Sequence, residues 1–413
     1  MRKAFPKTGL DWADIKEHLS EARKDDVDWR GGKITGLVYF AGDDVMQVAQ
    51  DAYTMFFGEN AVYSGVYPSL AMMESEVIEL TLELLHGGES ATGSMSTGGT
   101  ESIFLALKAA RDWSKANRIV DDTPEIIVSL TAHPAFDRAA GYLGMKIVRI
   151  PQASDFRADV SAMADAITRS TIMLVGSAPQ YPHGVIDPIV DLGELGQSRD
   201  LWLHVDACVG GFIAPFVRKL GYPIPDFDFA VPGVTSISAD VHKNGYSAKG
   251  ASTVLYRDPE YFKYQGFEFD QWGRGRYATN TFMGSRPGGA VASAWAVMHY
   301  LGEEGYMRIA QEVMHIREAL MDGVNRIDGL ETFGDPQLTI FTFGSTAFDI
   351  FAVADGLSEA GWYVNRIQDP AGIHLMLSLV QKPVLEEYLS DLSYTVEKVR
   401  TRRVTRGKRE VSY

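Results

Sequence analysis

Three short segments of the chain carry residue types that could bind an anion or form a covalent bond. The first, STGGTES at residues 96–102, runs directly into an apolar helical pattern. Glycines let the backbone approach an anion, and the free amides and positive dipole end of the helix would hold a phosphate. A tight turn with Thr100 as a helix cap would explain the same residues without a ligand.

The other two segments supply an acid and an amine. Asp206 ends the apolar run LWLHVD, where a carboxylate can cap a turn or pair with a buried cation. Lys243 lies in the segment SISADVHKNG, just after a short apolar run. A desolvated lysine there could form a Schiff base, whereas a lysine on the surface would have no such role.

Together these features form one constellation, because Lys243 follows Asp206 by 37 residues and both follow the glycine turn. Pyridoxal 5′-phosphate needs an anion site, a carboxylate for its ring nitrogen and a lysine for its aldehyde. A zinc site at His204 and Asp206 lacks a third ligand, and the single cysteine, Cys208, has no partner, so we expect no metal. No G-x-S-x-G segment indicates a serine hydrolase.

Composition restricts the other classes of function. The chain has 413 residues, is 46% hydrophobic and carries a net charge of −15, so a general nucleic-acid surface is excluded. No apolar run is long enough to span a membrane, the first residues do not resemble a signal peptide, and we therefore expect a cytoplasmic protein without stable membrane insertion. Residues 398–409 hold seven Lys or Arg, which we interpret as a solvated helix end or as a polyanion-binding tail.

The elements that position these segments follow from apolar patterning. Strands are predicted at residues 126–130, 146–150, 171–177, 201–206, 235–238 and 252–256, with helical segments between most of them. This alternation favours an α/β fold with a mostly parallel sheet covered on both faces and ligands beyond the carboxyl ends of its strands. Helices are predicted over 71–86 and within 286–328. A small α+β unit combines strands at 337–345 and 373–379 with helices near 350–360 and 383–402. We expect an N-terminal segment over 1–60, a large domain over 61–328 and a small domain with a basic tail over 329–413.

Six ordered blocks of the sequence resemble sphingosine-1-phosphate lyases, which belong to the group II decarboxylase family of fold-type I pyridoxal-phosphate enzymes. The blocks are STGGTESIFLALKAARDW, HPAFDRAAGYLGMKIVRIP, APQYPHGVIDPI, LHVDACVGGFIAPF, GVTSISADVHKNGYSAKGASTVLY and GSRPGG. The resemblance runs from about residue 6 to about residue 400. It implies an aspartate-aminotransferase-like fold and a homodimer with shared active sites.

The resemblance also implies roles for individual residues. Lys243 would bond to the cofactor aldehyde, Asp206 would pair with the pyridinium nitrogen, and His133 would stack on the ring rather than only flank a helix start. Further cofactor contacts would come from Gly99, Thr100, Ser177 and His242, and, from the second subunit, Gly284 and Ser285.

The substrate phosphate is expected to bind apart from the cofactor, at Tyr39, Tyr63 and Lys249. Here the chain departs from the family pattern, because Tyr63 stands where a histidine is expected. Tyrosine can donate a hydrogen bond but cannot carry positive charge. Arg274, Arg276 or Arg286 could supply the missing charge.

The leading functional prediction is a carbon–carbon lyase that splits a phosphorylated long-chain amino alcohol into an aldehyde and ethanolamine phosphate by retro-aldol chemistry. Lys249, Tyr246 and His133 are the candidate bases. Amino-acid decarboxylation with the same cofactor is the alternative, since substrate posture decides which bond breaks. A third hypothesis is a non-catalytic scaffold whose basic tail binds RNA or anionic membrane.

Overall fold

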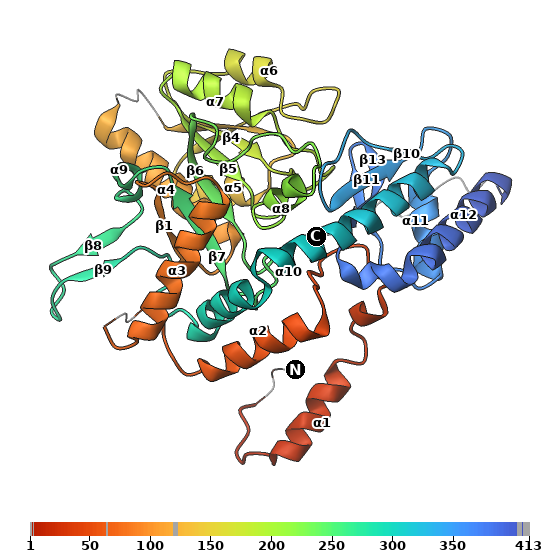
Figure 1. The fold of residues 1–413 in the computed structure, drawn as a ribbon, viewed down its shortest axis with the longest axis horizontal. Coiled ribbons are helices and arrows are strands. Elements are labelled where there is room, and N and C mark those ends of the chain that lie inside the picture. Colours follow the sequence, from red (N-terminus) through yellow and green to blue (C-terminus); the bar gives the residue numbers. More distant parts are fainter. Residues whose placement is uncertain (1, 3, 63–64, 119–122, 403–406, 408–413) are drawn as a thin grey trace.

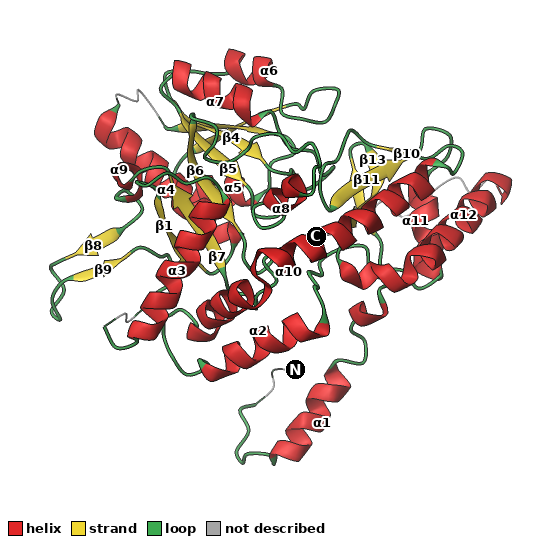
Figure 2. Ribbon diagram, in the orientation of Figure 1, coloured by secondary structure: helices red, strands yellow, loops and turns green. Residues whose placement is uncertain are grey.

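One long helix joins the seven-stranded sheet of the chain to its four-stranded sheet (Figure 1). The computed structural model describes residues 2, 4–62, 65–118, 123–402 and 407. Helix α10 (Gly288–Asn325) is kinked at Gly302, whose φ of 51° lies in the left-handed region. On the side of the larger sheet this helix packs on α2 (Asp43–Met55), α3 (Pro68–Leu84) and α8 (Ala214–Lys219). On the side of the smaller sheet it packs on α12 (Leu385–Arg402) and β10 (Glu331–Thr332). The two sheets are separate in Figure 2.

The larger sheet has seven strands in the order β1-β7-β6-β5-β4-β2-β3. Strands β2 to β6 pair in parallel, whereas β7 runs antiparallel to both β6 and β1. The mostly parallel sheet is therefore confirmed, but β1 was not predicted because its sequence TGSMS contains no apolar run. The strands are β1 (Thr92–Ser96), β2 (Glu125–Ser129), β3 (Lys146–Ile150), β4 (Thr171–Ser177), β5 (Trp202–Asp206), β6 (Val234–Ala239) and β7 (Ser252–Tyr256).

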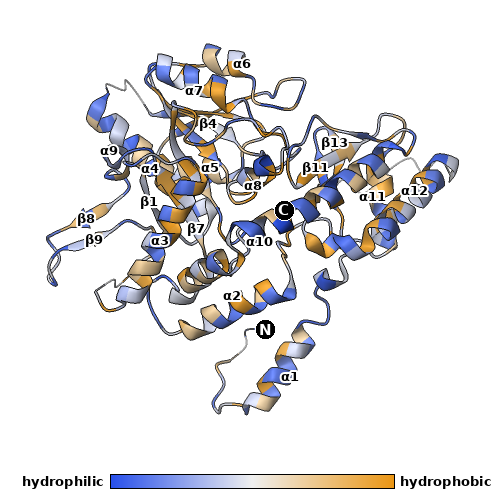
Figure 3. Ribbon diagram, viewed as in Figure 1, coloured by the Kyte–Doolittle hydropathy of each residue, from blue (hydrophilic) through white to orange (hydrophobic). Residues whose placement is uncertain are grey.

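Helices cover both faces of this sheet, as its continuous apolar strands require. Ile126 and Val128 of β2 face the core that includes α4 and α5, whereas Ile127 faces the core that includes α3, α7 and α8. Figure 3 shows apolar and polar residues mixed along the helices that cover the sheet. The helices of this unit are α3 (Pro68–Leu84), α4 (Gly99–Asn117), α5 (Ala135–Leu143), α6 (Val160–Asp165), α7 (Ile189–Ser198), α8 (Ala214–Lys219) and α9 (Pro259–Phe262).

The smaller sheet is antiparallel throughout, in the order β10-β11-β13-β12. It confirms the expected small α+β unit, although the polar strand β12 was not predicted. Its elements are β10 (Glu331–Thr332), β11 (Ile340–Gly344), α11 (Ile350–Glu359), β12 (Asn365–Gln368), β13 (Ala371–Met376), the 3-10 helix η2 (Leu379–Val384) and α12 (Leu385–Arg402).

Two segments extend from this body (Figure 1). Helix α1 (Trp12–Ala22) has no buried residue, and it precedes the 3-10 turn η1 (Trp29–Gly31) and helix α2 (Asp43–Met55). Strands β8 (Phe267–Phe269) and β9 (Tyr277–Thr279) form a projecting hairpin. Among the described residues, no helix is both long enough and apolar enough to cross a membrane.

Candidate active site

The strand directions bring the predicted site residues to one edge of the large sheet. Strands β2, β4, β5 and β6 end there because they are parallel, and β1 ends there because both β1 and β6 oppose β7. A cavity of about 580 Å³, which we call the catalytic cavity, opens at this edge. Its walls include Gly98, Gly99, Thr100, His133, Ser177, Asp206, His242, Lys243 and Lys249. The site position expected for an α/β fold is thus the one that the chain adopts.

The glycine turn forms a tight floor at the start of helix α4. A Cβ atom on Gly99 would lie 2.7 Å from Cys208 Sγ and 2.9 Å from Asp240 Oδ2, so only glycine fits without displacement. At Gly98 a Cβ atom would meet only His242 Cε1, at 3.5 Å. The turn therefore places the first amides of a 19-residue helix beside the cavity, where they can receive an anion.

Asp206 is held at the end of strand β5 with its carboxylate toward the cavity. One oxygen, Oδ1, accepts hydrogen bonds from the Cys208 amide at 3.1 Å and from Ser238 Oγ at 3.5 Å. Only 9% of the residue is exposed. A carboxylate fixed in this way is suited to pairing with a buried cationic group.

His204, two residues earlier on the same strand, has a different role. Its Nδ1 lies 2.8 Å from Ser236 Oγ and its Nε2 lies 3.3 Å from Ser238 Oγ, so neighbouring serines satisfy both ring nitrogens. Burial lowers the pKa of His204 to about 4, which keeps the ring neutral. No group of three or more metal-ligating side chains occurs among the described residues.

Lys243 follows strand β6 and contacts a carboxylate that the sequence analysis did not single out. Its Nζ lies 2.9 Å from Asp240 Oδ2, and Asp240 is 1% exposed. Burial by itself lowers the pKa of Lys243, but nearby negative groups, Asp240 first, outweigh it and raise the pKa well above the ordinary value. His242 Nε2 lies 3.7 Å from the same oxygen, while its Nδ1 accepts a hydrogen bond from the Ala251 amide at 3.2 Å.

His133 both flanks a helix start and faces the cavity. Its Nδ1 accepts a hydrogen bond from the Ala135 amide at 3.1 Å, so in the neutral ring the proton is on Nε2. Burial lowers the pKa of His133, which favours that neutral form. Stacking of this ring on the cofactor stays a prediction.

Lys249 and Tyr39 stand together at the boundary between two cavities. Lys249 Nζ donates a hydrogen bond to the His242 carbonyl at 2.8 Å and lies 5.1 Å from the centre of the Tyr39 ring. Burial, followed by the charge of Lys243, lowers the pKa of Lys249. Both residues line the catalytic cavity and a neighbouring cavity of about 620 Å³.

Tyr246 lines the second of these cavities and is not among the residues that line the first, so its role as a base stays a prediction. Its backbone turns left-handed, with φ of 62°, and its ring stacks toward Tyr306 with the ring centres 6.2 Å apart. Burial also raises the pKa of Tyr246. Tyr63 lies outside the described residues.

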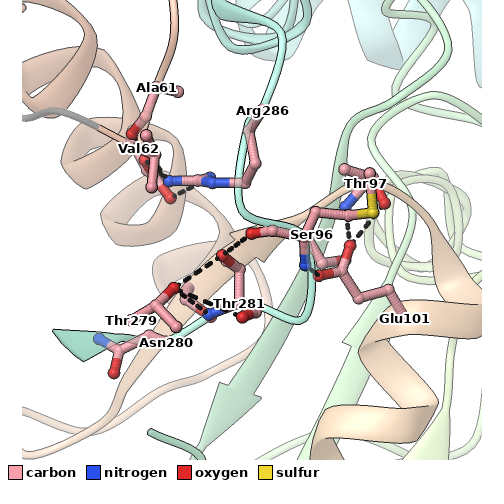
Figure 4. Close-up of polar contacts among 12 residues, drawn as sticks. Ala61, Val62, Ser96, Thr97, Glu101, Thr279, Asn280, Thr281 and Arg286 are labelled. Carbon is pink, nitrogen blue, oxygen red and sulfur yellow. Dashed lines mark hydrogen bonds and ion pairs between the residues drawn. The ribbon is translucent and has the colours of Figure 1, made fainter. Parts of the chain in front are cut away.

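The arginines proposed to replace the missing histidine do not line the catalytic cavity. Arg286 makes two contacts with Glu74, at 2.8 and 2.9 Å, and also donates to the Ala61 carbonyl (Figure 4). Arg276 pairs with Glu268 on the projecting hairpin at 2.7 Å. The cavity wall instead contains Arg138, from helix α5, which the sequence analysis did not select.

Glu101 is a second residue that the sequence analysis missed. Its Oε2 accepts hydrogen bonds from the amide and hydroxyl of Thr97 (Figure 4), and its Oε1 accepts from the amides of Phe282 and Met283 at 2.8 and 3.2 Å. This buried carboxylate therefore ties the glycine turn to another loop of the cavity wall. An acidic residue in the first turn after Gly-Gly-Thr is the signal that could have indicated it.

Gly284 and Ser285 do not line the catalytic cavity of their own chain. Ser285 Oγ accepts a hydrogen bond from Asn60 Nδ2 at 3.1 Å, and a Cβ atom on Gly284 would meet nothing within 4 Å. Their predicted contact with a second subunit stays a prediction.

The donor set fits pyridoxal phosphate. The glycine turn is a cradle that a side chain would fill, and Lys243 and the fixed carboxylate of Asp206 both line the same cavity. Asp240 Oδ1 is buried and accepts no hydrogen bond among the described residues, while its Oδ2 contacts Lys243 Nζ at 2.9 Å, so a second carboxylate lies beside the lysine.

Comparisons with known proteins agree with this chemistry. The pyridoxal-dependent decarboxylase conserved domain matches residues 2–344. The chain is 44% identical to sphingosine-1-phosphate lyase of Arabidopsis thaliana, with 96% of this chain and 74% of the relative aligned. The solved structure of a Burkholderia pseudomallei sphingosine-1-phosphate lyase is 38% identical, with a TM-score of 0.93 over 98% of this chain and 94% of that chain. L-aspartate/L-glutamate decarboxylase of Pyrococcus horikoshii is 33% identical, with 94% of this chain and 98% of the relative aligned.

Proposed function

Because the chain belongs to the pyridoxal-dependent decarboxylase family, we propose that it is a pyridoxal-phosphate lyase which cleaves sphingosine or sphinganine 1-phosphate. The products are a long-chain aldehyde and ethanolamine phosphate. The observation that carries this proposal is a single cavity whose wall unites the glycine turn, Asp206 and Lys243. The choice of substrate rests on the similarity to lyases over nearly the whole chain.

Different residues of this cavity would hold different parts of the cofactor. Pyridoxal phosphate supplies, when bound, an electron sink for the carbon whose bond is broken. Lys243 would hold its aldehyde carbon, and Asp206 would keep a proton on its ring nitrogen. Its phosphate would lie at Gly99, Thr100 and His242, with Ser177 beside the ring.

Cleavage requires a group that accepts the proton of the substrate hydroxyl, and Lys249 is the best suited. His133 Nδ1 already accepts the Ala135 amide, so the neutral ring can donate from Nε2 but has no free acceptor. Lys249 has a lowered pKa, which increases the share of neutral amine able to take up a proton. Its position beside Tyr39 also places it where the substrate phosphate is expected.

Decarboxylation is the alternative, and product analysis separates the two. The cofactor-loaded protein is incubated with sphinganine 1-phosphate and, separately, with a panel of amino acids, while aldehyde, ethanolamine phosphate and carbon dioxide are followed by mass spectrometry. We expect aldehyde and ethanolamine phosphate in equal amounts, and neither product with Lys243→Ala. Carbon dioxide from an amino acid without aldehyde from the phosphorylated base would identify a decarboxylase.

We also propose that the active enzyme is a cytoplasmic homodimer in which Gly284 and Ser285 reach the partner's cofactor. The hairpin just before them projects from the body and exposes half of the Phe267 and Trp272 surfaces, 54% and 50%, which supports a protein contact there. Light scattering coupled to gel filtration tests the dimer, and a monomer with full activity would exclude sharing of the site.

The described part of the basic tail does not support the hypothesis of a non-catalytic scaffold that binds RNA or anionic membrane. Within the described part of the chain, Lys398 pairs with Glu359 at 3.5 Å and Arg400 pairs with Asp328 at 2.6 Å. These pairs support a helix end that contacts its own domain, and most of the remaining tail lies outside the described residues.

A further inference from the structure

We propose that Asp240 is a positioning residue that holds the amine of Lys243 whenever this amine is not bonded to the cofactor. The proposal deepens the proposed function, since it rests on Lys243 as the residue that binds pyridoxal phosphate. It does not depend on which substrate is cleaved.

The geometry of Asp240 is that of a dedicated counter-ion. Its Oδ2 lies 2.9 Å from Lys243 Nζ, and the Lys243 amide also donates to the Asp240 carbonyl at 3.2 Å. The short turn after strand β6 therefore fixes the carboxylate and the amine on the same loop. The Lys243 side chain keeps 26% of its surface exposed, toward the cavity, while Asp240 is 1% exposed.

The Ser252 side chain is also a hydrogen-bond partner of this carboxylate, but it is uncharged, and Lys243 is the closest cationic group. Asp240 Oδ1 accepts no hydrogen bond, although it lies at the start of helix α4, where a carboxylate could cap free amides. The other basic group near it, His242, is farther away, at 3.7 Å from Oδ2, and burial lowers its pKa, which favours the neutral ring. A buried carboxylate with one close cation costs free energy unless that cation is present, so Lys243 is its stabilising partner.

The other titratable groups around Lys243 come from several elements. They are Asp206 and Cys208 at the end of β5, Tyr39 in the segment before α2, and His133, His242 and Lys249 in the cavity wall. Asp206 is held by Cys208 and Ser238, and burial raises the pKa of Cys208 so that its thiol stays neutral. Asp240 is therefore the carboxylate placed to hold the ammonium form.

This arrangement has a measurable consequence for cofactor binding. To bond to the aldehyde carbon, Nζ needs its lone pair, so one proton must first pass from Nζ to solvent. The amine and the aldehyde then combine with loss of one water molecule, and no oxidant or reductant is involved. Because Asp240 stabilises the protonated amine, the rate of covalent attachment should rise with pH. The midpoint of this pH profile should depend on Asp240.

The test measures attachment of pyridoxal phosphate to the full-length apoprotein by stopped-flow absorbance across a range of pH. Removing an opposite charge within about 4–6 Å shifts a pKa by about one unit or more. We therefore expect Asp240→Asn to move the midpoint down by about one pH unit, so that attachment below the midpoint is about tenfold faster. Asp240→Glu keeps the charge and should retain a midpoint close to the original.

Asp187→Asn is the matched control. Asp187 is also buried, but its oxygens accept the Ala158 and Ser177 amides, both at 2.8 Å, and it is not among the residues that line the cavity with Lys243. A general loss of packing would change the attachment rate by the same factor at every pH. Loss of the counter-ion would instead move the midpoint of the pH profile. An unmoved midpoint in Asp240→Asn, or an equal shift in Asp187→Asn, would overturn the proposal.

If Asp240→Asn fails to bind the cofactor, thermal unfolding of the apoprotein tests the pair between Asp240 and Lys243 instead. Asp240→Asn, Lys243→Met and the double variant form a double-mutant cycle. A stability loss in the double variant that is smaller than the sum of the two single losses supports the ion pair. Additive losses would overturn it. Since no substrate enters either experiment, failure of the lyase assay leaves this test intact, and failure of this test leaves the lyase assay intact.

Discussion

Replacing Gly99 with alanine tests the geometry of the glycine turn. The new methyl carbon would lie 2.7 Å from Cys208 Sγ and 2.9 and 3.1 Å from the two carboxylate oxygens of Asp240. Both neighbours are buried, so the clash cannot be relieved by moving a flexible side chain into solvent. Overpacking of this kind costs about 1–3 kcal/mol, and we expect the free energy of unfolding of the apoprotein to fall by that amount.

The neighbouring Gly98 provides the control, because alanine there would meet only His242 Cε1, at an ordinary distance of 3.5 Å. Urea unfolding followed by circular dichroism measures both variants, and their difference removes the effect of alanine on the unfolded chain, which both share. We also expect weaker cofactor binding in Gly99→Ala, since the strained start of helix α4 adjoins the predicted phosphate site. Equal stability of the two variants would refute the tight contact between the turn and Asp240.

Three further predictions concern other parts of the site. Asp206→Asn should keep the fold but slow turnover at saturating cofactor by about 100-fold or more, because the ring nitrogen loses its fixed negative partner; turnover near the original would mean that another group protonates the ring. The pKa of the buried His204 is about 4, below its unfolded value, so the stability it contributes is present above about pH 6.5 and is lost as pH falls toward 4. Thermal unfolding against pH should show that loss, up to about 3 kcal/mol from this residue, and His204→Gln should flatten the profile. Glu101→Gln turns an amide group toward the Thr97 amide or the Phe282 amide, and urea unfolding should show a loss of about 1–3 kcal/mol from an unsatisfied buried donor; a change near zero would contradict the tie between the two loops.

Residues that act through local patterns could be predicted from the sequence. The apolar runs that end at Ser177 and Asp206 are strands with those ends, and the glycine turn does begin a helix. Parallel strands bring their carboxyl ends to one edge, so Asp206 and Lys243 could be placed in one site before the fold was known. The cofactor follows from the chemistry of these residues, and the comparisons with known proteins support it.

Other parts of the site depend on contacts between segments far apart in the chain. Strand β1 is polar, and it is a strand because its backbone pairs with β7, some 160 residues later. Asp240 resembles any acidic loop residue in the sequence, and its role follows from a buried ion pair with Lys243 beside Gly99. Tyr246 is three residues from Lys243, but a left-handed backbone turns it toward the neighbouring cavity.

The sequence by itself determined the kinds of elements, their order and the residues able to do the chemistry, because hydrophobic period, turn chemistry and side-chain type are local properties. Only the tertiary structure decided which carboxylate faces which amine and which cations line the cavity, as with Arg138 in place of Arg286. Burial and charge act through space, and a group's distance along the chain does not fix its neighbours.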